Sequence, residues 1–257
     1  MNDLFSIKGK VALVTGGSRG IGLMIARGFV EAGAKTYISS RKADVCDAVA
    51  AELSKVGDCI SLPADLGSEA GAKGLADAIA SRETQLDILV NNAGATWGAP
   101  LADYPDDAFD KVMNLNVKGI FHLTRFLTPL LAKAGSDESP SRVINIGSID
   151  GLQAPTMETY AYSASKAAVH HMTRVMAHQL APQRIIVNAI APGPFESKMM
   201  AETIRTFGDN MRATNPLGRI GEPSDMAGTA IFLASKASAY ITGVVIPVDG
   251  GISTRHG

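Results

Sequence analysis

A tyrosine and a lysine lie four residues apart, at Tyr162 and Lys166, and a serine, Ser148, lies upstream of them. At this spacing two side chains share one face of a helix. A nearby ammonium group favours the tyrosinate, so the pair predicts a phenol whose pKa lies below the usual value of about 10. Such a phenol serves as an acid or base near neutral pH. The same spacing also arises by chance on surface helices. Other features of the chain must therefore decide between a catalytic pair and a chance pair.

A glycine-rich turn near the N-terminus predicts a phosphate-binding site. The apolar run 10–15 predicts a strand, and the periodicity of 23–32 predicts a helix. The turn between them consists of Gly16, Gly17, Ser18, Arg19, Gly20, Ile21 and Gly22. Small residues let the backbone approach a pyrophosphate, and a helix N-terminus offers free N–H groups. The alternative is a tight strand-to-helix turn that binds nothing.

The end of the second predicted strand indicates which dinucleotide binds. The run 34–40 is followed by Arg41 and Lys42, with no acidic residue to hold a ribose 2′-hydroxyl. Arg19 adds a positive charge from the glycine turn. Both features favour NADPH over NADH, because an arginine accommodates the 2′-phosphate. The alternative is a solvated strand end.

Strand-like and helical segments alternate along the whole chain. We expect strands at 10–15, 34–40, 59–63, 87–90, 142–147, 185–191 and 244–248. We expect helices at 23–32, 48–56, 70–80, 107–131 (one or two), 160–180 and 223–234, with a small helical lid near 195–212. This order predicts an α/β fold, a doubly wound parallel sheet of the Rossmann type with helices on both faces. No linker or repeat divides 1–257, so we expect a single domain.

The polar motifs follow the ends of predicted strands. In a doubly wound sheet, ligands bind outside the carboxyl ends of the strands. The turns and side chains in question are the glycine turn, Arg41, Asp65, Asn91, Asn92, Ser148 and Pro192. We therefore expect them to converge on one crevice, which the helix carrying Tyr162 and Lys166 can line.

The composition of the chain argues against several classes of binding partner. The chain has 257 residues, a net charge of −1 and 46% hydrophobic residues. This balance implies neither a nucleic-acid nor a membrane partner, and no run is long enough to span a bilayer. Cys46 and Cys59 lack metal-ligand spacing, and the adjacent His170 and His171 diverge on a helix, so we expect no metal. We expect a cytoplasmic protein.

Taken together, the motifs resemble those of the short-chain dehydrogenases/reductases over nearly the whole chain. The matching segments are TGGSRGIG at 15–22, Asp65-Leu66, NNAG at 91–94, Asn116 in NVKG, Ser148, Tyr162 with Lys166, Asn188 in VNAIAPG and VDGG at 248–251. Within that family the chain is most similar to the NADPH-dependent 3-oxoacyl-acyl carrier protein reductases, in particular those assigned to bacterial rhamnolipid biosynthesis.

The resemblance implies roles for individual residues. It makes Tyr162 the general acid, Lys166 the group that lowers the pKa of Tyr162 and holds the nicotinamide ribose, and Ser148 a donor to the substrate carbonyl. It makes Asn116 the residue that positions a water in a relay to Lys166. The implied NADP(H) contacts are Gly16, Gly17, Ser18, Arg19, Ile21, Gly22, Arg41, Asp65, Leu66, Asn92, Gly94, Tyr162, Lys166, Phe195 and Ser197. The resemblance also implies a homotetramer.

The substrate is less well defined. Apolar residues recur at helical spacing in the lid, and Trp97, Leu152 and Met157 lie in loops that could face it. They predict a pliable pocket for a hydrophobic acyl thioester, or else simple packing of the lid. The reductases resembled here carry basic residues before the fifth and sixth strands. This chain has the acidic segment 135–141 and a displaced Arg184, which argues against docking of acyl carrier protein.

Three functions remain open from the sequence. The first is NADPH-dependent reduction of a 3-oxoacyl thioester to the 3-hydroxyacyl thioester, feeding lipid or glycolipid synthesis. The second is NADP-linked reduction of another hydrophobic ketone, quinone or steroid-like alcohol. The third is a non-catalytic NADP-binding sensor, against which the intact set Ser148, Tyr162, Lys166 and Asn116 argues.

Overall fold

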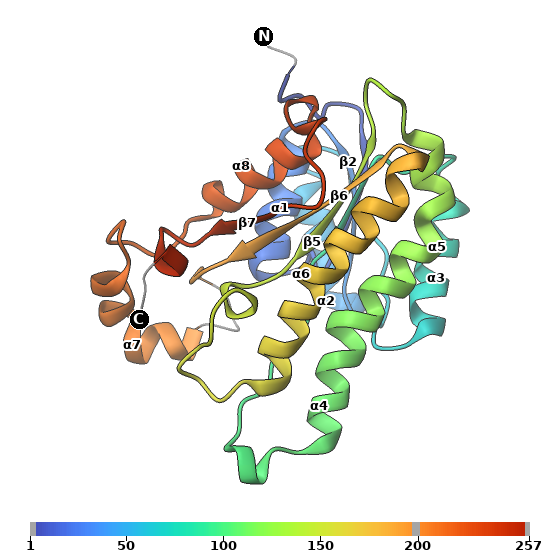
Figure 1. Ribbon diagram of the computed structural model, residues 1–257. Coiled ribbons are helices and arrows are strands. Elements are labelled where there is room, and N and C mark those ends of the chain that lie inside the picture. The colour runs from blue at the N-terminus through green and yellow to red at the C-terminus, as the bar shows by residue number, and fades with distance from the viewer. Residues whose placement is uncertain (1–3, 197–200, 255–257) are drawn as a thin grey trace.

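The computed structural model describes residues 4–196 and 201–254. At its centre lies a seven-stranded parallel sheet in the order β3-β2-β1-β4-β5-β6-β7 (Figure 1). The strands are β1 (Val11–Thr15), β2 (Lys35–Ser39), β3 (Cys59–Ser61), β4 (Ile88–Asn91), β5 (Ser141–Ile146), β6 (Ile185–Pro192) and β7 (Val245–Val248). The predicted doubly wound parallel sheet is confirmed.

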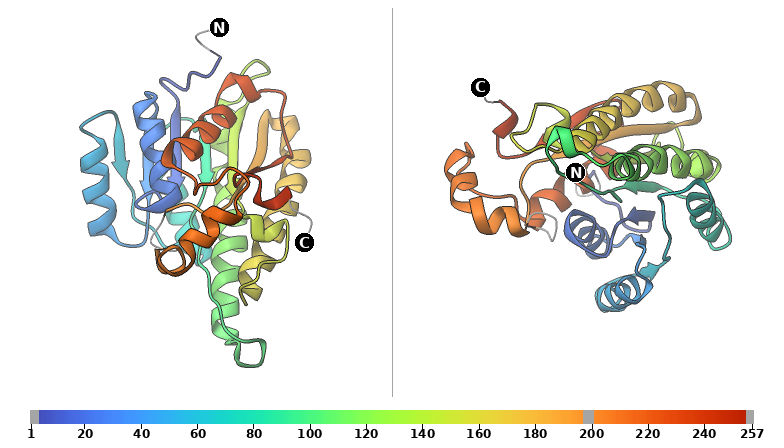
Figure 2. Two further views of the ribbon diagram at one scale, coloured as in Figure 1. Left: turned by 90° about the vertical axis from the view of Figure 1, so that its left-hand side faces the viewer. Right: turned by 90° about the horizontal axis from the view of Figure 1, so that it is seen from below.

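Helices cover both faces of the sheet (Figure 2). They are α1 (Gly20–Glu31), α2 (Ala43–Leu53), α3 (Glu69–Ala80), α4 (Asp106–Met113), α5 (Gly119–Ala134), α6 (Tyr160–Leu180), α7 (Ala201–Thr214) and α8 (Pro223–Ala234). One apolar core joins α1, α2 and α8 to the sheet, and a second joins α3, α5 and α6 to the opposite face. Helix α7 lies outside these two layers (Figure 1).

The strand order reverses between β1 and β4, which are neighbours in the sheet. At such a switch point the connections leave in opposite directions and open a crevice at the carboxyl ends of the strands. Thr15, the last residue of β1, links the two strands there, because its hydroxyl donates to the Val90 carbonyl at 3.2 Å. The same hydroxyl accepts the N–H groups of Asn92 and Ala93, at 2.9 and 3.0 Å.

A buried polar network fixes the neighbouring strand ends. The Asn91 amide donates to Thr124 on α5 at 3.0 Å and to Asn145 on β5 at 2.9 Å, and Asn145 donates to Thr173 on α6 at 2.9 Å. Buried amides are costly unless they are hydrogen-bonded, so this set favours a single arrangement of β4, β5, α5 and α6.

The predicted segment 107–131 is a continuous rod with an irregular centre. Helices α4 and α5 are joined by a π-helical turn, Asn114–Lys118, in which Gly119 N donates to the Asn114 carbonyl. One extra residue in the turn shifts the face that later side chains present, and apolar periodicity does not reveal such a turn. It places Asn116 on the inner side, where it is buried.

The largest errors in the predicted boundaries concern two helix starts. Helix α2 begins at Ala43 rather than at 48, because its exposed first turn, residues 43–45, precedes the first buried residue, Cys46. The lid helix α7 begins at Ala201, whereas Phe195 is extended and forms a bridge with Gly221.

Among the described residues no helix is long and apolar enough to cross a membrane.

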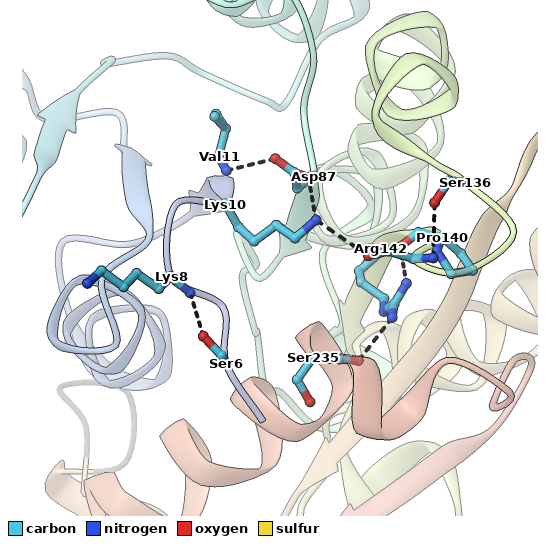
Figure 3. Close-up of polar contacts among 10 residues, drawn as sticks. Ser6, Lys8, Lys10, Val11, Asp87, Ser136, Pro140, Arg142 and Ser235 are labelled. Atoms are coloured by element: carbon cyan, nitrogen blue, oxygen red, sulfur yellow. Dashed lines mark hydrogen bonds and ion pairs between the residues drawn. The ribbon is translucent and has the colours of Figure 1, made fainter. Parts of the chain in front are cut away.

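A charged cluster holds the amino-terminal edge of the sheet together, on the side away from the crevice (Figure 3). Asp87 is buried and accepts hydrogen bonds from Lys10 Nζ and Val11 N, both at 2.9 Å. Arg142 is also buried and donates to the carbonyl of Ser235, just after α8, at 2.9 Å. Burial lowers the pKa of Arg142 to about 10, and the charge of Asp87 opposes that shift.

We expect the substitution Asp87→Asn to lower the free energy of unfolding by about 1–3 kcal/mol, because it leaves Lys10 and the buried Arg142 without their anion. Urea denaturation measures the change. Asp137→Asn is the control, since its ion pair with Arg184 leaves the two side chains 83% and 52% exposed and should contribute little. Equal stability of Asp87→Asn and the parent protein would contradict the role of Asp87.

Candidate active site

The glycine turn between β1 and α1 forms a tight cradle. Gly16 and Gly20 have φ angles of +65° and +53°, which L-residues rarely adopt, and a Cβ on Gly22 would overlap the Gly16 carbonyl. Among the described residues no side chain caps α1, and its first turn holds no acidic residue. The free N–H groups of this helix end therefore fit the pyrophosphate of a dinucleotide.

Asn92 supports this turn from the end of β4. Its side-chain amide donates to the carbonyls of Thr15 and Gly16, at 2.8 and 3.3 Å. The amide nitrogen of Asn92, predicted to lie along the adenine ribose, is thus engaged with the turn itself. Gly94, two residues later, lies against Asn116, whose Oδ1 would be 3.2 Å from a Cβ at that position.

The predicted adenosine side is assembled from three strand ends. Gly17 N donates to the Ser39 carbonyl at 3.2 Å, which brings the glycine turn to the end of β2. Ala64 N donates to the Ser40 carbonyl at 3.1 Å, which brings the loop after β3 to the same place. The relevant residues here are the exposed Arg19, Arg41 and Asp65, the half-buried Ile21, and the buried Ser18 and Leu66. Two guanidinium groups at this junction fit a 2′-phosphate.

Ser148, Tyr162 and Lys166 come together beyond the end of β5. Ser148 follows the strand and is buried, and its hydroxyl faces the Tyr162 phenol. Lys166 is buried one helical turn beyond Tyr162, with Nζ 5.4 Å from the centre of the tyrosine ring. The Lys166 ammonium donates to the carbonyl of Ile146, the last residue of β5, at 2.8 Å.

The expectation that Lys166 lowers the pKa of Tyr162 is not met in this structure. Burial raises the pKa of Tyr162 to about 12; the Ser148 hydroxyl opposes the rise and the charge of Asp150 adds to it. Burial also lowers the pKa of Lys166 to about 8, against the effect of Asp150. The phenol therefore holds its proton at neutral pH, because desolvation disfavours the charged tyrosinate.

Asn116 is buried in the π turn with its side chain fully engaged. Its Oδ1 accepts from Ala95 N at 2.8 Å, and its Nδ2 donates to the Ala95 carbonyl and to Ser165, both at 2.9 Å. Ser165 precedes Lys166 on α6, so Asn116 ties the loop after β4 to the helix that carries the pair. The predicted water relay would have to use the backbone of Asn116.

Two residues near the site had no predicted role there. His170 is buried one turn beyond Lys166, and burial lowers its pKa. Its ring packs between Gly147 and Gly151, the glycines on either side of Ser148. Asp150 follows Ser148 by two residues, and its effect on Tyr162 and Lys166 depends on a turn that sequence patterns do not reveal.

Phe195, one of the two residues predicted to close over the nicotinamide, is buried, and its ring packs against Gly221. Ser197 lies outside the described residues. No group of three His, Cys, Asp or Glu side chains that could hold a metal ion occurs in the described chain.

We expect Gly147→Ala to destabilise the protein by about 1–3 kcal/mol, because the added methyl group overlaps the imidazole of His170. Thermal unfolding measures the change, and adding His170→Ser should recover much of it. Gly74→Ala is the control, since a Cβ there meets nothing within 4 Å in helix α3. A Gly147→Ala variant as stable as the parent would show that the imidazole does not confine the Ser148 loop.

Comparison with known proteins agrees with this geometry. Residues 16–253 match the family model described as enoyl-(acyl carrier protein) reductase. The chain is 50% identical over 254 residues to the rhamnolipids biosynthesis 3-oxoacyl-acyl-carrier-protein reductase of Pseudomonas aeruginosa, covering 98% of this chain and 99% of that one. It is 38% identical over 273 residues to the short-chain dehydrogenase/reductase PhomF of Diaporthe leptostromiformis, covering 97% and 93%.

A solved structure gives the same result. The RhlG/NADP active-site complex of Pseudomonas aeruginosa superposes with a TM-score of 0.95 at 50% identity, covering 98% of this chain and all of that one. Sequence identity, coverage and fold agree with the Gly-rich turn and the Ser148, Tyr162 and Lys166 arrangement. The chain belongs to the short-chain dehydrogenase/reductase family.

Proposed function

We propose that the protein catalyses NADPH-dependent reduction of a 3-oxoacyl thioester to the 3-hydroxyacyl thioester, feeding lipid or glycolipid synthesis. The observation that carries this proposal is the placement of Ser148, Tyr162 and Lys166 at the carboxyl end of β5, two strands along the sheet from β1, which leads into the glycine turn. The 50% identity to a 3-oxoacyl-acyl-carrier-protein reductase supports the choice of substrate class.

NADP(H) is proposed as the cofactor, and it supplies the hydride when bound. The free N–H groups of α1 and the glycine turn support a pyrophosphate site, and Arg19 and Arg41 support a 2′-phosphate site. Asp65 and Leu66 are proposed to flank the adenine beside the end of β2. Phe195 and Ser197 are proposed to close over the nicotinamide.

In the proposed reaction, negative charge develops on the ketone oxygen as the carbon is reduced. The hydroxyl groups of Ser148 and Tyr162 donate hydrogen bonds to that oxygen, where electrostatic stabilisation is most effective. Tyr162, which holds its proton at neutral pH, transfers it to the oxygen as general acid. Lys166 remains cationic below its pKa of about 8 and stabilises the tyrosinate that results. We assign Asn116 a supporting role, with its backbone carbonyl placing a water for Lys166.

Exposed apolar side chains in the loops after β4 and β5, which we call the rim of the site, support a hydrophobic acyl chain as part of the substrate. Trp97, Leu152 and Met157 are 44%, 42% and 47% exposed. Their loops lie side by side, because Ala99 N donates to the Glu158 carbonyl at 3.2 Å. An acyl chain would cover such side chains and remove their apolar surface from water.

The structure gives no support to carrier-protein docking through Arg184. This residue lies just before β6, at the amino-terminal edge of the sheet, and its Nε donates to Asp137 at 2.6 Å. Its charge is thus paired and lies at the edge opposite to Ser148. We propose that a thioester is accepted without a carrier protein bound there.

We also propose that the protein is a homotetramer and that it is cytoplasmic. Exposed Phe109, Phe121 and Val175, on α4, α5 and α6, support a homotetramer that pairs these helices. Free, buried Cys46 and Cys59 support a cytoplasmic location, where thiols stay reduced.

To test the reaction, we would follow NADPH oxidation with 3-oxooctanoyl-N-acetylcysteamine. Tyr162→Phe should lower kcat/KM by about 10²–10⁴-fold while NADPH still binds, because the general acid is gone. Tyr160→Phe is the matched control: it removes a neighbouring phenol whose hydrogen bond goes to Glu158 at 3.2 Å, and it should keep near-parental activity. Unchanged turnover by Tyr162→Phe would rule out the assigned acid.

To test cofactor choice, we would compare kcat/KM for NADPH and for NADH. Arg41→Ala should reduce the preference for NADPH by about tenfold or more, through loss of a charge-assisted contact to the 2′-phosphate. Lys55→Ala, which removes an exposed cation beyond the end of α2, should leave the preference unchanged. The 2′-phosphate assignment fails if both variants keep the parental preference.

A further inference from the structure

Asp150 lies beside the catalytic group without being part of it. It is the central residue of a single 3₁₀ turn, Ile149–Gly151, and its N–H donates to the Ser148 hydroxyl at 3.2 Å. The turn packs on α6, the helix that carries Tyr162 and Lys166. Asp150 is half-buried, and its charge lies close enough to act on both Tyr162 and Lys166.

The carboxyl group of Asp150 has no hydrogen-bond or ion-pair partner in the part of the chain that the structure describes. The Lys166 ammonium is close enough to act on its charge but donates to the Ile146 carbonyl instead. Burial raises the pKa of Asp150, and the charge of Lys166 opposes that rise. An uncompensated carboxylate in a partly desolvated place exerts a strong field on nearby charges.

The two segments at the rim offer nothing to neutralise a second anion. Segment 93–105 contains one ionisable acid, Asp103, and segment 148–160 contains Asp150 and Glu158, whereas neither segment contains a lysine or arginine. A 3-oxo acid carries its carboxylate only two bonds from the ketone carbon, so that group would lie close to Asp150. A thioester or ester has the same skeleton and no charge at that position.

We propose that Asp150 is a specificity-determining residue that excludes ketones bearing a carboxylate next to the reacting carbonyl and admits uncharged 3-oxo thioesters and esters. The inference rests on the proposed function, which it narrows to a substrate class. Like-charge repulsion at close range rejects the wrong ligand without adding contacts to the right one. Asp150 takes no part in proton transfer in this account.

The test compares two ligands with the same 3-oxooctanoyl skeleton, the anionic 3-oxooctanoate and its uncharged methyl ester. We would measure kcat/KM for both with the parent and with Asp150→Asn. We would also measure the dissociation constants of both from the NADP⁺ complex, in which no reduction can occur, by isothermal titration calorimetry. The ratio of ester to acid should fall at least about tenfold in Asp150→Asn, because the repulsion is removed. Asp150→Glu keeps the charge and should keep much of the ratio.

Glu158→Gln is the matched control. It also removes one negative charge from the same segment, but Glu158 is exposed and should leave the ratio at its parental value. Asp150→Ser provides a second uncharged variant if the asparagine variant does not fold. An unchanged ratio in the folded uncharged variants, or an equal fall in Glu158→Gln, would overturn the proposal.

The octanoyl thioester separates this proposal from the proposed function. If the parent protein does not reduce the thioester but the dissociation constants show the charge effect, the proposed reaction fails and the selection by Asp150 holds. If the thioester is reduced and the ratio does not respond to Asp150, the reaction holds and the selection fails.

Discussion

The Lys166 ammonium donates to the carbonyl of Ile146, and the geometry of the active site depends on this contact. A buried lysine is costly to desolvate, as its pKa of about 8 shows, so it is retained where a fixed acceptor compensates it. The acceptor is the last residue of β5, a central strand that the sheet holds on both sides. Helix α6 is thereby held to the strand end, and Tyr162, one turn earlier, is held to Ser148.

The two edges of the sheet have different roles: the amino-terminal edge stabilises the fold, and the carboxyl edge carries the candidate site. At the amino-terminal edge, Lys10 donates to Asp87, whose charge also acts on the buried Arg142, and Arg142 donates to the Ser235 carbonyl at the end of α8. At the carboxyl edge, the glycine turn, the Ser148 loop and α6 carry the N–H groups and hydroxyls that we propose bind the cofactor and the substrate. Parallel strands make this division possible, because every strand contributes its end to the same side.

Much of this account could be predicted from the sequence. Strand–helix alternation predicted the sheet, and strand-end motifs predicted that the glycine turn and Ser148 follow the carboxyl ends of their strands. The direction of the Tyr162 pKa shift was wrong because spacing reveals a neighbouring charge but not desolvation. The π turn at Asn116 and the packing of His170 could not be predicted, for a related reason. Each depends on three-dimensional contacts that leave no periodic signal in the sequence.

The most direct test of the central claim is the fate of the hydride. NADPH carrying deuterium at the transferred position would be incubated with 3-oxooctanoyl-N-acetylcysteamine and, separately, with the 2-octenoyl thioester, and the products analysed by mass spectrometry. A carbonyl held by Ser148 and Tyr162 predicts a 3-hydroxyoctanoyl product with one deuterium on C3 and no reduction of the enoyl thioester. A saturated acyl product carrying the deuterium, or a hydroxyacyl product without it, would contradict the account.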